Sequence, residues 1–510
     1  MGLRRIVVFT AWAFSLFSCV EVANAAPETF HLNNGLDFEL PSLEPIFNEP
    51  WPLVSEPAKP SQVRDIRERL SSTHSLFRAV DMIESGRFES ANNFILQAFA
   101  QQPELQQDGL ALELRAMAEA LTGQLEASVT TFDRAAELQP GSSAPLTKKG
   151  IALSAAGQFE QAAIAYEAAL QRQPGDLLAQ SRLGLLYTAF RDYDRAVPLL
   201  SAVLKTRAES TAVDIVAALG KIAVEQGRPD DAIALLAPRI SPSLENARAQ
   251  LTFGLALFLD GKLERALLHL EQAHAQAPED FQAAFAVGRA YALARRFDEA
   301  AAAFSKAIAY RTDDPVPAIR ELALVRLASS QFAEAEALFA KIAQEGNATP
   351  FDLARLGEVQ VLRGNFQAAQ DTYEQMCQRF PDSSESYQKL ASFQASLRQY
   401  SKAEATLIAG LGRLGEDATL LRTLALLYGR QGAVSEAIAA ADRWVTAAPD
   451  DAAALEMLGV LYEEDGNFSD AMESYRSALA KDPNRFNGFS GWFRWHKMWG
   501  VGLVRGRVFR

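Results

Sequence analysis

Apolar positions recur along this chain with a period of about 34 residues, in twelve consecutive copies between residues 72 and 485. In most copies a small residue stands near position eight and an aromatic residue or leucine at position eleven. A small residue follows at position twenty, a bulky one at twenty-four and alanine at twenty-seven, with proline often at thirty-two. Apolar residues spaced by three and four predict helices. Each copy therefore predicts two amphipathic helices joined by a short turn.

The copies are expected to begin at residues 72, 109, 143, 177, 213, 247, 281, 316, 350, 384, 418 and 452. The small residue at position eight should let the two helices of a copy approach closely, with the bulky residue at position twenty-four packed nearby. In the fifth copy, Pro238 and Pro242 predict a short second helix around residues 230–240 and a change of superhelical pitch there. Both a functional hinge and a surface kink without consequence remain open.

Two of these copies carry the motif most completely. They read Gly150, Gly157-Gln158-Phe159, Ala162, Tyr166, Ala169, Pro174 and Gly357, Gly364-Asn365-Phe366, Ala369, Tyr373, Pro381. This pattern resembles the tetratricopeptide repeat (TPR) family over about four-fifths of the chain. The resemblance implies an all-α fold, a right-handed superhelical solenoid of about twelve antiparallel helix pairs. It also implies a concave groove, lined by the first helix of each pair, that binds peptides, helices or partner domains.

The segments outside the repeats predict export. Residues 1–25 resemble a signal peptide, with Arg4 and Arg5, an apolar stretch and the small residues Ala23-Asn24-Ala25 before the cleavage point. An alternative is a lipoprotein box ending at Cys19, which would be lipidated. Cleavage after Ala25 leaves Cys377 alone, so no intramolecular disulfide is expected. We therefore expect a periplasmic protein, with lipid anchoring through Cys19 as the alternative.

Two further segments flank the repeats, which divide into residues 72–246 (copies one to five) and 247–485 (copies six to twelve). Residues 26–71 are expected to form an acidic, proline-rich tether, because residues 26–60 show no helix or strand period. A short motif within it that docks on a partner or folds back on the solenoid is an alternative. Residues 486–510 hold three tryptophans and only basic charges. This tail is expected to cap the last repeat; a membrane-touching segment and an altered reading frame are alternatives.

The net charge and the sequence motifs limit which partners and which chemical functions we expect. The net charge is −13, and the signal and tail segments are basic, so the repeats and tether are more acidic still. Binding to duplex nucleic acid needs clustered basic residues, so we do not expect nucleic acid as a partner. The sequence Gly410–Gly415 matches G-x-G-x-x-G but follows a predicted helix rather than a strand, which favours a helix end. No catalytic, metal or cofactor site is expected, nor a small-molecule ligand.

Binding residues are instead expected in the groove, where positions two, five, nine and twelve of each first helix should face inward. An apolar stripe there is typical of an interface, and arginines could clamp an acidic partner segment. The alternative is that these arginines pair with neighbouring acids and the apolar residues pack within the solenoid. The predicted partner-binding residues are Lys221, Arg248, Leu251, Leu255, Phe258, Phe285, Arg289 and Arg320.

The sequence thus predicts a non-enzymatic scaffold or adaptor in the cell envelope. Its partners should be other proteins, bound as peptide or helix segments, with peripheral membrane contact through the tail as an alternative. A narrower alternative is an assembly subunit of an exopolysaccharide or protein secretion system at the outer membrane. That alternative rests on analogy between folds alone.

Overall fold

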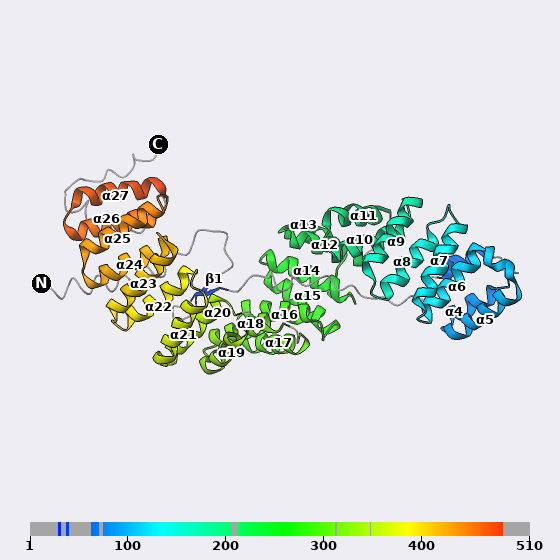
Figure 1. The fold of residues 1–510 in the computed structure, drawn as a ribbon, viewed down its shortest axis with the longest axis horizontal. Helices are drawn as coiled ribbons and strands as arrows, with labels where there is room; N and C mark the ends of the chain where they lie inside the picture. The colour runs from blue at the N-terminus through cyan, green and yellow to red at the C-terminus, as the bar shows by residue number, and fades with distance from the viewer. Residues whose placement is uncertain are drawn as a thin grey trace. The chain divides into compact units, whose positions relative to one another are not determined.

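The structure is a computed structural model, and it describes residues 29–31, 37–39, 63–70, 75–206, 213–311, 314–346 and 348–482. The predicted signal peptide, the predicted tail and the predicted lipidation of Cys19 lie outside these residues. The chain forms two compact units, one spanning residues 42–315 and the other comprising residues 1–41 together with residues 316–510. Helices account for most of the described residues in both units (Figure 1).

Among the described residues of the first unit, a short helix, α3 (Arg64–Arg69), is followed by seven helix pairs. The pairs are α4 (Phe77–Glu84) with α5 (Phe88–Gln101), α6 (Gly109–Leu121) with α7 (Leu125–Leu138), α8 (Ala144–Ala155) with α9 (Phe159–Arg172), α10 (Leu177–Ala189) with α11 (Tyr193–Thr206), α12 (Val213–Glu225) with α13 (Pro229–Leu236), α14 (Ala247–Leu259) with α15 (Leu263–Gln276), and α16 (Phe281–Leu293) with α17 (Phe297–Tyr310). A 3₁₀ helix, η2 (Pro103–Gln107), connects the first two pairs.

In the second unit, the described residues form five helix pairs. They are α18 (Val316–Ala328) with α19 (Phe332–Gln344), α20 (Pro350–Leu362) with α21 (Phe366–Arg379), α22 (Ser384–Ser396) with α23 (Tyr400–Leu414), α24 (Ala418–Gln431) with α25 (Val434–Ala447), and α26 (Ala452–Asp465) with α27 (Phe468–Lys481). Strands β1 (Thr29–His31) and β2 (Asp37–Glu39) pair antiparallel, with Phe30 opposite Phe38. Residues 26–60 show no strand period in the sequence, so these two short strands were not predicted.

The predicted repeat register is confirmed. In the last eleven repeats, the first helix begins within one residue of the expected start. An aspartate often stands just before that start and caps the helix. Asp176 is an example, because its Oδ1 accepts hydrogen bonds from the backbone N–H of Leu178 and Ala179, each at 3.0 Å. This contact satisfies two amide groups that the first turn of a helix leaves without partners.

Close approach within a pair explains the small residue at position eight. A Cβ atom built on Gly150 would lie 2.5 Å from the ring of Tyr166, and one built on Gly357 would lie 2.5 Å from the ring of Tyr373. Both aromatic residues occupy position twenty-four of the same repeat. Glycine therefore fits these two crossings best, because a larger residue would overlap the buried ring unless the ring moved. The same contact recurs at Gly184, Gly220, Gly254, Gly288 and Gly459.

The fifth repeat has the predicted short second helix. Helix α13 contains eight residues, whereas the second helices of the other repeats contain thirteen to fifteen. It ends at Leu236, just before Pro238, because proline lacks the amide hydrogen that a continuing helix needs. Pro198 has no such effect, since it lies inside the full-length α11. The predicted change of superhelical pitch at α13 stays a prediction.

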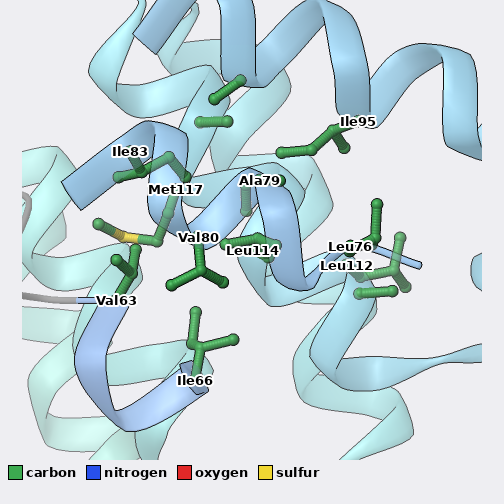
Figure 2. Packing of buried hydrophobic residues seen from close by; sticks show 14 of the residues in the cluster. Val63, Ile66, Leu76, Ala79, Val80, Ile83, Ile95, Leu112, Leu114 and Met117 are labelled. Carbon is green, nitrogen blue, oxygen red and sulfur yellow. The ribbon is translucent and has the colours of Figure 1, made fainter. Parts of the chain in front are cut away.

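Helix α3 departs from the expected tether. It lies within residues 26–71, yet Val63 and Ile66 are fully buried and Leu70 nearly so. All three belong to the apolar core of the first two repeats. In Figure 2, Val63 lies beside Met117 of α6 and Ile66 faces Val80 of α4. The end of the predicted tether is thus an ordered part of the first unit.

Candidate interaction surface

The first helices of successive repeats carry the residues predicted to bind a partner. Four of those eight residues are buried: Leu251 and Leu255 on α14, and Phe285 and Arg289 on α16. The expectation that they form a solvent-facing stripe is therefore wrong. A side chain that already packs inside the protein has little surface left to offer a partner.

Phe285 illustrates the packing. It is fully buried, and its ring centroid lies 5.5 Å from that of Phe304 in an edge-on arrangement and 5.4 Å from that of Phe281. Aromatic pairs at such separations are stabilising beyond their buried area. Phe285 is thus a core residue of the seventh repeat, which matches the alternative that the apolar positions pack within the solenoid.

The remaining predicted residues are less buried. Arg248 and Phe258 of α14 are partly exposed. Lys221 of α12 is also partly buried and forms an ion pair with Glu225 on the same helix. Burial raises the pKa of the Glu225 carboxyl to about 7, although the positive charge of Arg191 offsets part of this rise. Lys221 is therefore engaged within its own repeat rather than directed at solvent.

Arg320 of α18 is held by an acid, as the alternative interpretation expected. Its guanidinium donates to both carboxylate oxygens of Asp352, at 2.6 and 2.9 Å. Asp352 is fully buried at the start of α20, where it also accepts a hydrogen bond from the Thr349 backbone N–H at 2.9 Å in a capping box. Two-point contacts of this kind are strong. Arg320 thus joins one repeat to the next, and a clamp on a partner would have to replace this contact.

A different cluster of charges joins helix α3 to the first helices of the second and third repeats, α6 and α8. Glu113 of α6 is fully buried and accepts hydrogen bonds from Lys148 of α8 at 2.5 Å and from Gln139 at 3.2 Å. Helix α3 adds two charges to this pair. Its Arg69 donates to Glu113 at 2.8 Å, and its Asp65 accepts from Lys148. Four charged groups from three helices therefore meet at one point.

Helix α3 also contacts α4. Arg67 forms ion pairs with Asp81, at 3.0 Å, and with Glu84, and its guanidinium lies over the Phe77 ring at 5.3 Å from the ring centroid. This surface was missed from the sequence, because the proline-rich composition around it indicated a tether. The available signal was the spacing of Val63, Ile66 and Leu70 by three and four, which indicates one apolar helix face.

The glycine-rich motif at residues 410–415 and Cys377 both occupy structural positions in helices. Gly410 lies inside α23, against Leu420 and Tyr387, and Gly415 ends that helix with φ at +79°, as the helix-end interpretation of this motif expected. The Cys377 thiol is partly buried, which raises its pKa to about 11 and makes the nucleophilic thiolate scarce near neutral pH. Within the described ranges, no cluster of three or more His, Cys, Asp or Glu side chains could hold a metal ion. None of the helices described is both long and apolar enough to span a membrane.

Sequence comparisons agree with this architecture. Three family models described as tetratricopeptide repeat match the chain, one at residues 147–212, 251–315, 389–452 and 422–486, another at 188–251 and a third at 353–383. Together these matches cover more than half of the sequence. The chain belongs to the tetratricopeptide repeat family. A comparison with curated protein sequences gives no match.

Several solved structures are similar to this tetratricopeptide repeat chain. The crystal structure of YrrB, described as a TPR protein with an unusual peptide-binding site, is 23% identical with a TM-score of 0.31, covering 39% of this chain and 97% of that one. The APC/C hetero-tetramer Cut9–Hcn1 is 14% identical with a TM-score of 0.32, covering 83% and 96%. MamA is 20% identical with a TM-score of 0.28, covering 32% and 96%.

Proposed function

We propose that this protein is a non-enzymatic scaffold that binds segments of other proteins on the first helices of its repeats. The observation that carries the proposal is the register. Within each of the two units, the helix pairs of the described residues repeat one architecture, and neighbouring first helices such as α12 and α14 or α22 and α24 contact each other. Solenoids of this kind provide extended binding surfaces because every repeat adds another strip to the same face.

The site of action that we propose is the cell envelope of a bacterium. The support is the pattern of residues 1–25, with its basic start, apolar stretch and small residues before Ala26. The absence of a second cysteine after that point agrees with a chain that relies on stacking rather than disulfides. Mass spectrometry of the chain purified from its native cells should find Ala26 at the N-terminus. A chain that retains residues 1–25 would contradict export by this route.

Partner binding can be tested with a photo-crosslinking amino acid placed at one residue of the full chain in its native cells. Leu178 is suitable because it lies near the start of a first helix, α10, and 39% of its surface is exposed. Ile164 is the matched control: it is an exposed aliphatic residue, at 64%, on the second helix α9.

The proposal predicts one or a few discrete crosslinked proteins from position 178 and none in common from position 164. Identical crosslinks from both positions would indicate nonspecific contact, because the two residues differ in the helix that carries them and not in hydrophobicity. No crosslink from position 178, in a chain that is exported and folded, would count against a first-helix binding face.

A further inference from the structure

Helix α3 is a segment outside the repeats that lies on their first helices. It contacts α4, α6 and α8, which are the first helices of three successive repeats. A helix that served only to cover the end of the solenoid would pack on the first repeat. Helix α3 instead extends across the face on which we propose that partners bind.

The apolar side of α3 fits that face. Val63, Ile66 and Leu70 are buried, whereas Arg64 and Glu68 on the opposite side are exposed. The side chains that α3 covers include Val80 on α4 and Met117 on α6, as Figure 2 shows. These two residues occupy position nine of their repeats, one of the positions expected to face a bound segment. Helix α3 therefore occupies the place of a ligand.

Two charged residues of the repeats, Glu113 and Lys148, make the polar contacts with α3. Glu113 is fully buried, and the side chain of Lys148 is only 5% exposed. A buried ion pair is often no more stabilising than apolar side chains of the same volume, so it is better explained by specificity than by stability. This pair offers a carboxylate to an incoming base and an ammonium to an incoming acid. In α3, Arg69 and Asp65 make those two contacts.

We propose that the face of α4, α6 and α8 is a binding site for a short amphipathic helix of a partner protein, and that α3 is the chain's own occupant of this site. The partner helix carries apolar side chains at positions i, i+3 and i+7, matching Val63, Ile66 and Leu70. It carries an acid at i+2 and a base at i+6, matching Asp65 and Arg69. The inference rests on the proposed function for the claim that the occupant is a protein.

The occupant is suited to exchange. Helix α3 has six residues, too few to be stable as an isolated helix, so its order depends on docking. Because it is tethered to its site, its effective concentration there is about millimolar. A separate helix with the same contacts therefore binds weakly while α3 is docked and more tightly once α3 is displaced.

The test measures binding of a fluorescent synthetic peptide with the sequence of residues 61–72, SQVRDIRERLSS, to the full-length protein by fluorescence anisotropy. In the Ile66→Asp protein, a charge on the apolar side of α3 should release that helix and open its site. We expect this protein to bind the peptide at least tenfold more tightly than the unchanged protein. The Glu68→Lys protein is the matched control, because this residue is exposed on the same helix, and it should bind like the unchanged protein.

A second variant covers the case in which Ile66→Asp unfolds the first repeat, which circular dichroism and thermal unfolding would show. Arg67→Glu with Arg69→Glu removes the ion pairs with Asp81, Glu84 and Glu113, and leaves the apolar side of α3 and the Asp65–Lys148 pair intact. It should increase peptide affinity at least threefold. A peptide carrying Asp65→Lys and Arg69→Glu should lose most of its affinity for either variant, since it meets Lys148 and Glu113 with like charges.

If both variants are folded and neither binds the peptide more tightly than the unchanged protein, α3 is a structural part of the first repeat and the inference is wrong. Continued crosslinking from position 178 would then leave the proposed function standing. Conversely, tight peptide binding in a chain that crosslinks to no protein would support the helix site and contradict the scaffold function.

Discussion

The first three repeats and the sixth and seventh repeats place similar residues on their first helices and use them differently. In the first three, position nine holds Val80, Met117 and Ile151, and a separate segment, α3, covers the first two. In the sixth and seventh, the equivalent region holds Leu255 and Arg289, which packing among the repeats buries. An apolar stripe on first helices therefore does not by itself mark a binding surface. What distinguishes the first three repeats is a ligand-like segment and a buried ion pair that receives it.

The largest expected effect concerns Phe285. If it is a core residue, Phe285→Ala should lower the free energy of unfolding by about 3 to 5 kcal/mol, because it leaves a cavity beside Phe304 and Phe281. Urea unfolding followed by circular dichroism measures the change. Phe258→Ala, at a partly exposed position of α14, is the control and should cost clearly less. Normal stability of the Phe285→Ala protein together with weaker partner binding would restore the interface interpretation.

The helix crossings give a smaller effect that differs between the two regions. An added Cβ would lie 2.5 Å from the Tyr166 ring at Gly150, but 2.9 Å from the Phe304 ring at Gly288. Overpacking a buried contact costs about 1 to 3 kcal/mol, while alanine gains about 0.5 to 1 kcal/mol over glycine as a helix former. Gly150→Ala should therefore destabilise more than Gly288→Ala, by about 1 kcal/mol in thermal unfolding. Equal losses would mean that the two crossings are equally tight.

The turns between paired helices differ as well. Gly157 joins α8 to α9 with φ at +75°, whereas Arg295 joins α16 to α17 with φ at +59°. A side chain in this left-handed conformation costs about 1 kcal/mol, which glycine avoids. Arg295→Gly should raise the free energy of unfolding by up to about 1 kcal/mol, and Gly157→Ala should lower it. A destabilised Arg295→Gly protein would show that the arginine makes a contact that outweighs the strain.

The smallest expected effect is the contribution of His269, in the sixth repeat, to the pH dependence of stability. Burial lowers the pKa of His269, whose Nδ1 lies 2.7 Å from the side-chain oxygen of Gln250. The unfolded chain then binds a proton that the folded chain does not, so stability falls as the pH drops through about 6.5. The loss should stay below about 1 kcal/mol at pH 6. His269→Gln should remove it, and an unchanged pH profile in that variant would assign the effect to other groups.

The sequence predicted most of the fold because the fold is local. The 34-residue period predicted where the first helices begin, and Pro238 predicted that α13 is short. The contact between positions eight and twenty-four followed from side-chain size within one repeat. Groups that meet across repeats were not predictable in this way. Asp65 and Lys148 lie 83 residues apart, and no period connects them. Arg320 looked like a free clamp because its partner, Asp352, belongs to the next repeat.

The most direct test of the first-helix binding face is hydrogen–deuterium exchange of the full-length protein with and without an excess of the α3 peptide. A peptide carrying Glu68→Lys differs in mass from the chain's own segment, and the change lies on the exposed side of α3. The account predicts that the peptide accelerates exchange in α3 of the protein, while α4 and α6 stay protected and α16 is unaffected. Exchange in α3 that does not respond to saturating peptide would contradict it.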